Sequence, residues 1–117
     1  MKNPNLESQK RLQHILQAIL TIEEYVKESD SIHFTDTPLL HDAVLFQFTV
    51  IGEAINHVES EKLERYAYPW YKVRSFRNLI AHEYFNIKLS AVWNIIEGEL
   101  PRLKATIEVI LENEFNL

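Results

Sequence analysis

With 117 residues, 46% of them hydrophobic, the chain has the size and apolar content of one folded domain spanning residues 1–117. The absence of cysteine excludes disulfides, thiolate metal sites and thiol catalysis, and a net charge of −5 argues against broad, nonspecific binding of nucleic acid. Only two glycines and four prolines occur, so long helices joined by few loops fit better than a sheet with many tight turns.

The first residues are not typical of a targeting segment. Residues 1–5 lead into a polar, charged stretch without the apolar core of a signal peptide. No uninterrupted apolar run approaches the roughly 20 residues that a membrane span needs. These patterns predict a cytoplasmic protein that does not enter a membrane.

The first helix is expected over residues 6–29. Its apolar residues recur at three- and four-residue spacing and form one stripe: Leu12, Ile15, Leu16, Ile19, Ile22 and Val26. Charged and amide side chains fill the opposite face. The segment that follows, residues 29–37, is predicted to be a loop.

A second helix is expected to begin with Thr37 as its cap and Pro38 in its first turn, where the missing N–H of proline costs nothing. The stretch 43–51 is apolar on nearly every side, so this helix must be covered on more than one face. Either it is the central helix of a bundle, or it packs both in its own protomer and against a second copy. We favour a homodimer. Gly52 would let another helix approach closely, at about 1 kcal/mol of helix propensity.

The third helix is expected over residues 70–81 or 70–82, after a mixed, aromatic segment that can hold a short helical turn. Residues 65–82 contain no acid and four basic residues, Arg65, Lys72, Arg74 and Arg77. An acidic chain thus carries one local basic stretch, and any binding of RNA there is expected to be local, weak and salt-sensitive.

The fourth helix is expected to be capped by Asn86 and to be kinked or split by Pro101, with Gly98 before it. Its apolar positions have helical spacing: Leu89, Val92, Trp93, Ile96, Leu100, Leu103, Ile107 and Ile110. The chain is therefore expected to be all-α, an up-and-down bundle of four to five helices.

The third helix also carries the candidate chemistry. Val73, Phe76 and Ile80 mark its buried face, and Arg77 lies about 40° from Val73, at the border of that face, where its fork of donors suits a phosphate. His82 follows five positions later, about 140° from Arg77 on a continuous helix. The two side chains can therefore cooperate only if the helix ends before His82 or if a second copy supplies part of the site.

Ordinary structural roles are open for the same residues. Arg77 can pair with a carboxylate on a neighbouring helix, His82 can lie favourably at a helix end when charged, and Tyr84 can belong to the edge of the core. Composition and spacing alone favour these roles over a catalytic site.

Arg77, His82 and Tyr84 form the pattern R-x4-H-x-Y, which resembles the motif of HepT-like HEPN proteins. Further blocks resemble that family in the same order: Asp42-Ala43, Ile51-Gly52-Glu53-Ala54, Tyr68-Pro69-Trp70, Arg77-Asn78, Val92-Trp93 and Leu100-Pro101. They cover about residues 42–110, whereas the N-terminal helix agrees in pattern without a distinctive motif.

The resemblance implies a dimerising HEPN-type bundle that acts as an endoribonuclease toxin without a metal or a cofactor. By the same resemblance, His82 is a general base or acid, Arg77 holds the scissile phosphate, and Asn78 orients one of these two. The site would lie in a cleft between two protomers, and cleavage would leave a 2′,3′-cyclic phosphate. Lys72 and Arg74 are candidate contacts to the RNA.

Tyr84 has a separate role by resemblance. The implied partner is a minimal, MntA-like nucleotidyltransferase, the antitoxin of a type VII-like toxin–antitoxin pair, which transfers AMP to the tyrosine of the motif. The added bulk and phosphate charge, two residues from His82, would block and repel RNA. Because another enzyme must reach Tyr84, we expect it to be at least partly exposed. The alternative is a non-catalytic subunit that binds nucleotide or substrate for the nucleotidyltransferase.

Other polar and aromatic residues are expected to be structural. Four histidines show no metal-ligand spacing and are expected at the surface or in caps: His14, His33, His41 and His57. Four aromatics could stack on bases, but packing in the core or an interface is the expected role: Tyr66, Tyr68, Trp70 and Tyr71. Glu83 places a carboxylate beside His82. RNA phosphate can approach His82 only if the Glu83 side chain points away from it.

Overall fold

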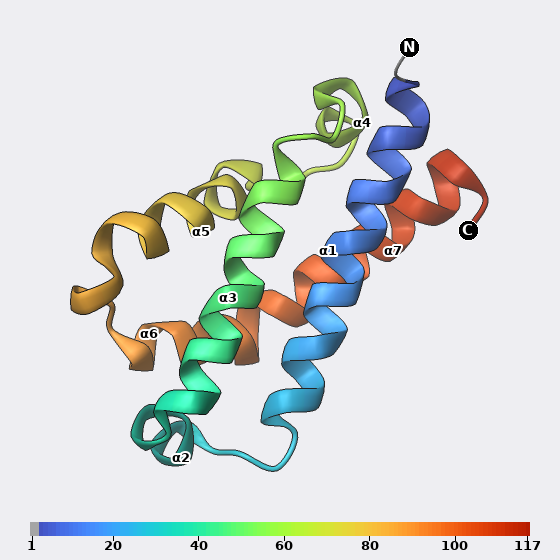
Figure 1. Ribbon diagram of the computed structural model, residues 1–117. Coiled ribbons are helices and arrows are strands. Elements are labelled where there is room, and N and C mark those ends of the chain that lie inside the picture. The colour runs from blue at the N-terminus through green and yellow to red at the C-terminus, as the bar shows by residue number, and fades with distance from the viewer. Residues whose placement is uncertain (1–2) are drawn as a thin grey trace.

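The computed structural model describes residues 3–117, and that part of the chain is helical without a strand (Figure 1). Its elements are α1 (Pro4–Val26), α2 (Ser31–Asp36), α3 (Pro38–Ile55), α4 (Ser60–Glu64), α5 (Trp70–Glu83), the 3-10 turn η1 (Tyr84–Asn86), α6 (Leu89–Asn94), the π-helical segment η2 (Ile95–Glu99) and α7 (Leu100–Phe115). The long helices α1, α3, α5 and the run α6–α7 confirm the expected all-α fold, and α2 and α4 are short additions.

α1 begins at Pro4, slightly earlier than expected, because Asn3 caps it. The side-chain oxygen of Asn3 accepts hydrogen bonds from the backbone N–H groups of Asn5 and Leu6, at 3.1 and 3.2 Å. The helix ends at Val26, three residues before the predicted boundary. Its apolar stripe is confirmed, since four of the six predicted residues are fully buried and the other two pack against the core: Leu12, Ile15, Ile19, Ile22, Leu16 and Val26.

The prediction of a loop over residues 29–37 is wrong, because α2 forms there. Asp30 caps it by accepting a hydrogen bond from the backbone N–H of His33 at 2.8 Å. Phe34 is completely buried, and its ring centroid lies 5.4 Å from that of Trp93 in α6. A local cap and one buried aromatic ring are therefore sufficient to make this connection helical.

α3 is the central helix and packs between α1 and α5 (Figure 1). Pro38 lies in its first turn as predicted, but Thr37 makes no side-chain capping bond. By length and composition alone, Pro38–Ile55 could cross a membrane. A core helix passes the same test, and the inner faces of α3 are buried against its two neighbours, so the pattern is weak evidence for insertion.

The fourth helix is split, as Pro101 predicted, and the split takes the form of η2. Proline has no N–H to donate and its ring clashes with the carbonyl four residues earlier. The backbone N–H of Leu100 instead donates to the carbonyl of Ile95, five residues back, which is a π-helical bond. The predicted cap Asn86 is wrong: it belongs to η1, and α6 begins at Leu89 without a side-chain cap.

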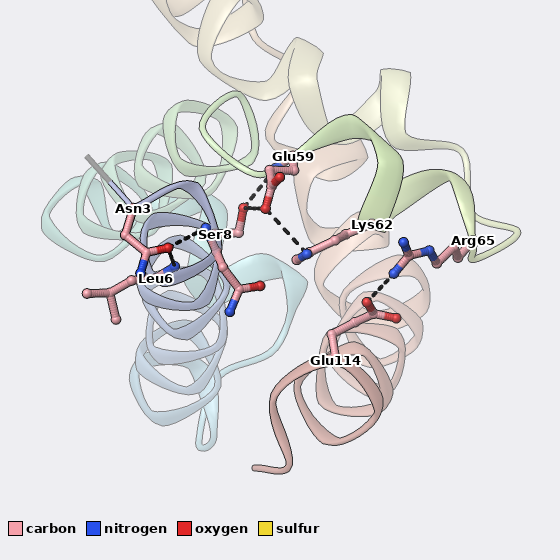
Figure 2. A network of polar contacts seen from close by, with 8 residues as sticks. Asn3, Leu6, Ser8, Glu59, Lys62, Arg65 and Glu114 are labelled. Carbon is pink, nitrogen blue, oxygen red and sulfur yellow. Dashed lines mark hydrogen bonds and ion pairs between the residues drawn. The ribbon is translucent and has the colours of Figure 1, made fainter. Parts of the chain in front are cut away.

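A polar network fixes α4 between the two ends of the chain (Figure 2). The buried hydroxyl of Ser8 in α1 donates to Glu59 at 3.3 Å and accepts from the Glu59 backbone N–H at 3.0 Å. Glu59 also pairs with Lys62 at 3.3 Å. Figure 2 further shows Arg65 reaching Glu114 of α7, so the first arginine of the basic stretch is engaged in the fold.

Candidate active site on α5

α5 is one continuous helix from Trp70 to Glu83, so it does not end before His82. It continues one residue past the predicted boundary and then tightens into the 3-10 turn η1. Five positions on such a helix separate Arg77 and His82 by about 140°. A helix that ends before His82 is thereby excluded, so the two side chains can cooperate only if a second copy of the chain supplies part of the site.

The predicted buried face of α5 is confirmed. Val73 is buried, and Phe76 meets Phe48 of α3 edge to face with ring centroids 5.1 Å apart. Phe76 and Ile80 also border a small apolar cleft whose other walls come from α3 and from residues 87–95. The motif residues line neither wall of this cleft, so they belong to a different face of α5.

Arg77 is held at the border between α5 and α3. Its Nε lies 3.0 Å from Oε2 of Glu53. The other carboxylate oxygen of Glu53, Oε1, lies 3.3 Å from Nε2 of His57. The Arg77 and Glu53 side chains are 51% and 48% exposed, so the pair is open to water and contributes at most about 1 kcal/mol. Arg77 therefore pairs with a carboxylate on a neighbouring helix, which is the structural role that the sequence left open for it. The pair uses Nε, however, and the two Nη nitrogens make no other ion pair within residues 3–117.

Gly52 permits this arrangement, as the sequence predicted. A Cβ atom placed on Gly52 would lie 2.6 Å from the backbone nitrogen of Arg77 and 3.1 Å from its Cβ. Real Cβ atoms do not approach backbone atoms that closely. The close contact between α3 and α5 is therefore centred on the arginine of the motif.

The exposed face of α5 carries the remaining candidates. Asn78 and His82 are both exposed and four residues apart, and neither side chain has a hydrogen bond or ion pair to another described residue. Arg74 lies four residues before Asn78 on the same side and is also exposed. Lys72 instead borders a second cleft with Tyr68 of the preceding loop. One chain thus presents Arg74, Asn78 and His82 together and leaves Arg77 and Lys72 on either side of them.

Tyr84 is 42% exposed, which confirms the expectation that it is accessible. Its hydroxyl donates to Oδ1 of Asp42 in α3 at 2.7 Å. This hydrogen bond is the main cause that raises the pKa of Tyr84, because it stabilises the protonated phenol that donates it. Phe85, the next residue, packs edge to face on the Tyr84 ring and is 94% exposed.

Asp42 and Glu53 are two carboxylates beside the motif for which the sequence predicted no role. Eleven residues separate them, which is close to three helical turns, so they share one face of α3 within about 20°. Each receives one end of the motif: Glu53 meets Arg77 and Asp42 meets Tyr84. The available signal was two carboxylates with this spacing on a helix that has no other Asp, Glu, Lys or Arg.

The remaining predictions for polar and aromatic residues are mostly confirmed. His14, His33 and His57 are exposed, whereas His41 is largely covered and packs against Phe34. Tyr66, Tyr68 and Trp70 pack into the fold through hydrogen bonds to Glu114, Glu99 and the Leu63 carbonyl. Tyr71 is the exception and is exposed.

A family model described as "Ribonuclease HepT-like" matches residues 15–110, which contain every motif residue described above. The chain belongs to the HepT-like ribonuclease family. This membership agrees with the all-α bundle, and it covers α1 from Ile15 as well as the motif-bearing helices.

Named relatives of this HepT-like chain carry the same assignment. A candidate RNase of Caldanaerobacter subterraneus subsp. tengcongensis is 32% identical over 104 residues, which cover 88% of this chain and 93% of that protein. A ribonuclease HepT, so named with the qualifier probable, from Thermococcus cleftensis is 28% identical over 98 residues, 83% of this chain and 89% of that protein.

A longer relative places the HepT-like part in a larger protein. A protein of Methanocaldococcus jannaschii, named as a gamma-glutamylcyclotransferase and candidate RNase, is 35% identical over 102 residues, or 86% of this chain. The chain spans only 46% of that protein's length. No solved structure matches the HepT-like chain significantly.

Proposed function

We propose that this chain is a metal-independent endoribonuclease, the cytoplasmic toxin of a type VII-like toxin–antitoxin pair. Membership of the HepT-like ribonuclease family supports the activity. The observation that carries the proposal is the placement of the motif: His82 and Asn78 lie exposed on α5 without partners in residues 3–117, and Arg77 is fixed beside them by Gly52 and Glu53.

The residues supply three functions in the proposed cleavage. The 2′-oxygen of RNA attacks the adjacent phosphorus, the bond to the 5′-oxygen breaks, and a 2′,3′-cyclic phosphate remains. His82 takes the proton from the 2′-hydroxyl or delivers one to the leaving oxygen, because imidazole exchanges protons near neutral pH. Arg77 binds the phosphate through its free Nη nitrogens and stabilises the charge that develops there, and Asn78 orients one of these groups.

The site is completed by a second copy of the chain in this proposal. Arg77 and His82 of one α5 point about 140° apart, so a phosphate bound by one arginine is best reached by the histidine of the partner protomer. A homodimer also accounts for large apolar side chains left exposed beside the motif: Leu39, Phe46 and Phe85. Arg74 and Lys72 extend the positive surface, since neither has an ion pair among the described residues.

Tyr84 is the proposed site of neutralisation by an MntA-like nucleotidyltransferase partner. Its exposure and its position in η1, directly after the helix that bears His82, support transfer of AMP to its hydroxyl. The added phosphate carries negative charge into the surface where RNA must approach.

Inducing the chain alone is expected to arrest bacterial growth, and His82→Ala is expected to abolish the arrest. Co-expression of the partner nucleotidyltransferase should rescue cells that carry the wild-type chain but not cells that carry Tyr84→Phe. His14→Ala removes an exposed imidazole from α1 and is the matched control, which should arrest growth like wild type. Full toxicity of His82→Ala would rule out catalysis by this residue.

Cleavage by the purified chain is expected to continue in excess chelator and to leave 2′,3′-cyclic phosphate ends. The reason is that the attack on phosphorus is assisted by imidazole and guanidinium groups of the chain. End-group analysis of a short labelled RNA checks both points. Loss of cleavage on chelation, restored by a divalent cation, would contradict the prediction.

The second candidate is a non-catalytic subunit that binds nucleotide for the nucleotidyltransferase. It is favoured by the Glu53–Arg77 ion pair, which partly neutralises the arginine, and by the net charge of −5. Under this function the chain alone leaves growth unaffected and binds a nucleotide without cutting RNA, so the growth experiment separates the two.

A further inference from the structure

The hydrogen bond between Tyr84 and Asp42 connects two parts of the chain that are 42 residues apart. Tyr84 lies in the turn η1, and Asp42 lies near the beginning of α3. Both groups remain accessible, since the tyrosine is 42% exposed and the Asp42 side chain is 49% exposed. The contact therefore fixes the direction of the phenolic oxygen without hiding it from a second enzyme.

We propose that Asp42 is the proton acceptor when a nucleotide is transferred to Tyr84. This inference rests on the proposed function, in which Tyr84 is the residue that receives AMP. The phenolic oxygen attacks the α-phosphorus of a nucleoside triphosphate and forms the new P–O bond. The bond from the α-phosphorus to the oxygen that bridges to the β-phosphate breaks, and pyrophosphate leaves. The phenolic proton passes to Oδ1 of Asp42 along the existing hydrogen bond.

A base is needed because the phenol is a weak nucleophile while it keeps its proton, and Asp42 is the carboxylate that already accepts a hydrogen bond from it. The neighbouring carboxylate raises the pKa of Tyr84, so almost no phenolate is present near neutral pH before the reaction. The proton must therefore leave as the P–O bond forms. A carboxylate that accepts the proton of an attacking hydroxyl is the usual arrangement in phosphoryl transfer.

Among the charged groups near the Tyr84 hydroxyl, Asp42 is the one that is hydrogen-bonded to it. Oδ1 of Asp42 also lies 3.2 Å from Nδ1 of His41, which packs edge-on against Phe34 of α2. His82 and Glu83 precede Tyr84 on α5 but have no contact with its hydroxyl, and Asp42 is the only charged group that perturbs it among the described residues.

The test compares wild type with Asp42→Asn as acceptors of AMP from the partner nucleotidyltransferase. The carboxamide oxygen can still accept the hydrogen bond from Tyr84, so its orientation is kept while the basic group is lost. With ATP labelled at the α-phosphate, the maximal rate of labelling near neutral pH should fall by about 10²-fold, with little change in KM for the chain. The deficit should shrink as the pH rises toward the ordinary tyrosine pKa of about 10, where phenolate needs no base.

Glu108→Gln is the matched control, since it removes one exposed carboxylate from α7 and should be labelled like wild type. Tyr84→Phe should take up no label. If wild type is labelled and Asp42→Asn is labelled equally fast at every pH, or changes only in KM, the role of Asp42 is overturned while the proposed function stands. If wild type is not labelled at all, neutralisation through Tyr84 fails, and this inference fails with it.

Discussion

A heterodimer of two inactive variants, Arg77→Ala and His82→Ala, is expected to cut RNA. If each site takes Arg77 from one protomer and His82 from the other, one of the two sites in this heterodimer has both residues intact. The other site lacks both. Co-expression with two affinity tags allows the heterodimer to be isolated, and its cleavage rate should be about half that of wild type, because a two-fold dimer has two equivalent sites.

The reason for this expectation is the continuity of α5. A break before His82 would have allowed the imidazole to turn back toward Arg77, but the helix runs through both residues to Glu83. The guanidinium is further held toward α3 by Glu53, on the border of the packed face, whereas His82 projects toward solvent. Each homodimeric variant alone should retain at most about 10⁻³ of the wild-type rate.

The control for complementation is a heterodimer of Arg77→Ala with the double variant Arg77→Ala/His82→Ala. No site in that assembly has both residues, so it should be as inactive as either parent. If the heterodimer of the two single variants, one protomer with Arg77→Ala and the other with His82→Ala, is inactive, both residues act from the same protomer. A purely monomeric chain that cleaves RNA would contradict the homodimer itself.

Much of the fold follows from local patterns in the sequence. The α1 stripe, the start of α3 at Pro38 and the split at Pro101 each depend on one element and its own backbone. Periodicity reports which face is buried, and proline reports where an N–H is missing. Gly52 is more informative, because a glycine inside an apolar helix predicted a close helix contact that the structure has at Arg77.

The features that were missed depend on residues far apart in the chain. Residues 31–36 are helical partly because Phe34 packs on Trp93, and the local sequence does not show that these two rings meet. Asn86 has a side chain that could cap a helix, but it lies in the turn η1, and α6 begins three residues later at Leu89. In the candidate site, the sequence placed Arg77 on the third helix and His82 at its end, with Tyr84 beyond it. It could not show that Glu53 would meet Arg77 and Asp42 would meet Tyr84, because that depends on how α5 packs along α3.

Gly52→Ala is expected to reduce RNA cleavage on the order of 10²-fold while leaving most of the chain folded. The new methyl group would overlap the backbone nitrogen of Arg77, which cannot rotate away as a side chain could, so α5 must shift outward. Overpacking of this kind costs about 1–3 kcal/mol, and the better helix propensity of alanine offsets about 1 kcal/mol of it. A shift of about 1 Å in a group that binds the transition state has a much larger effect on rate than on stability.

Gly98→Ala is the matched control, because it makes the same chemical change in a helical segment where no atom outside the neighbouring residues and the helix's own backbone lies within 4 Å of the added Cβ. It should leave cleavage unchanged and alter the free energy of unfolding by no more than about 1 kcal/mol, in the stabilising direction. Chemical denaturation gives the stability of both variants, and cleavage of a labelled RNA per folded molecule gives the activity. Equal behaviour of the two alanine variants would show that the position of Arg77 is not set by Gly52. A Gly52→Ala protein that is destabilised but cleaves at the wild-type rate would show that cleavage does not depend on how closely α5 packs on α3.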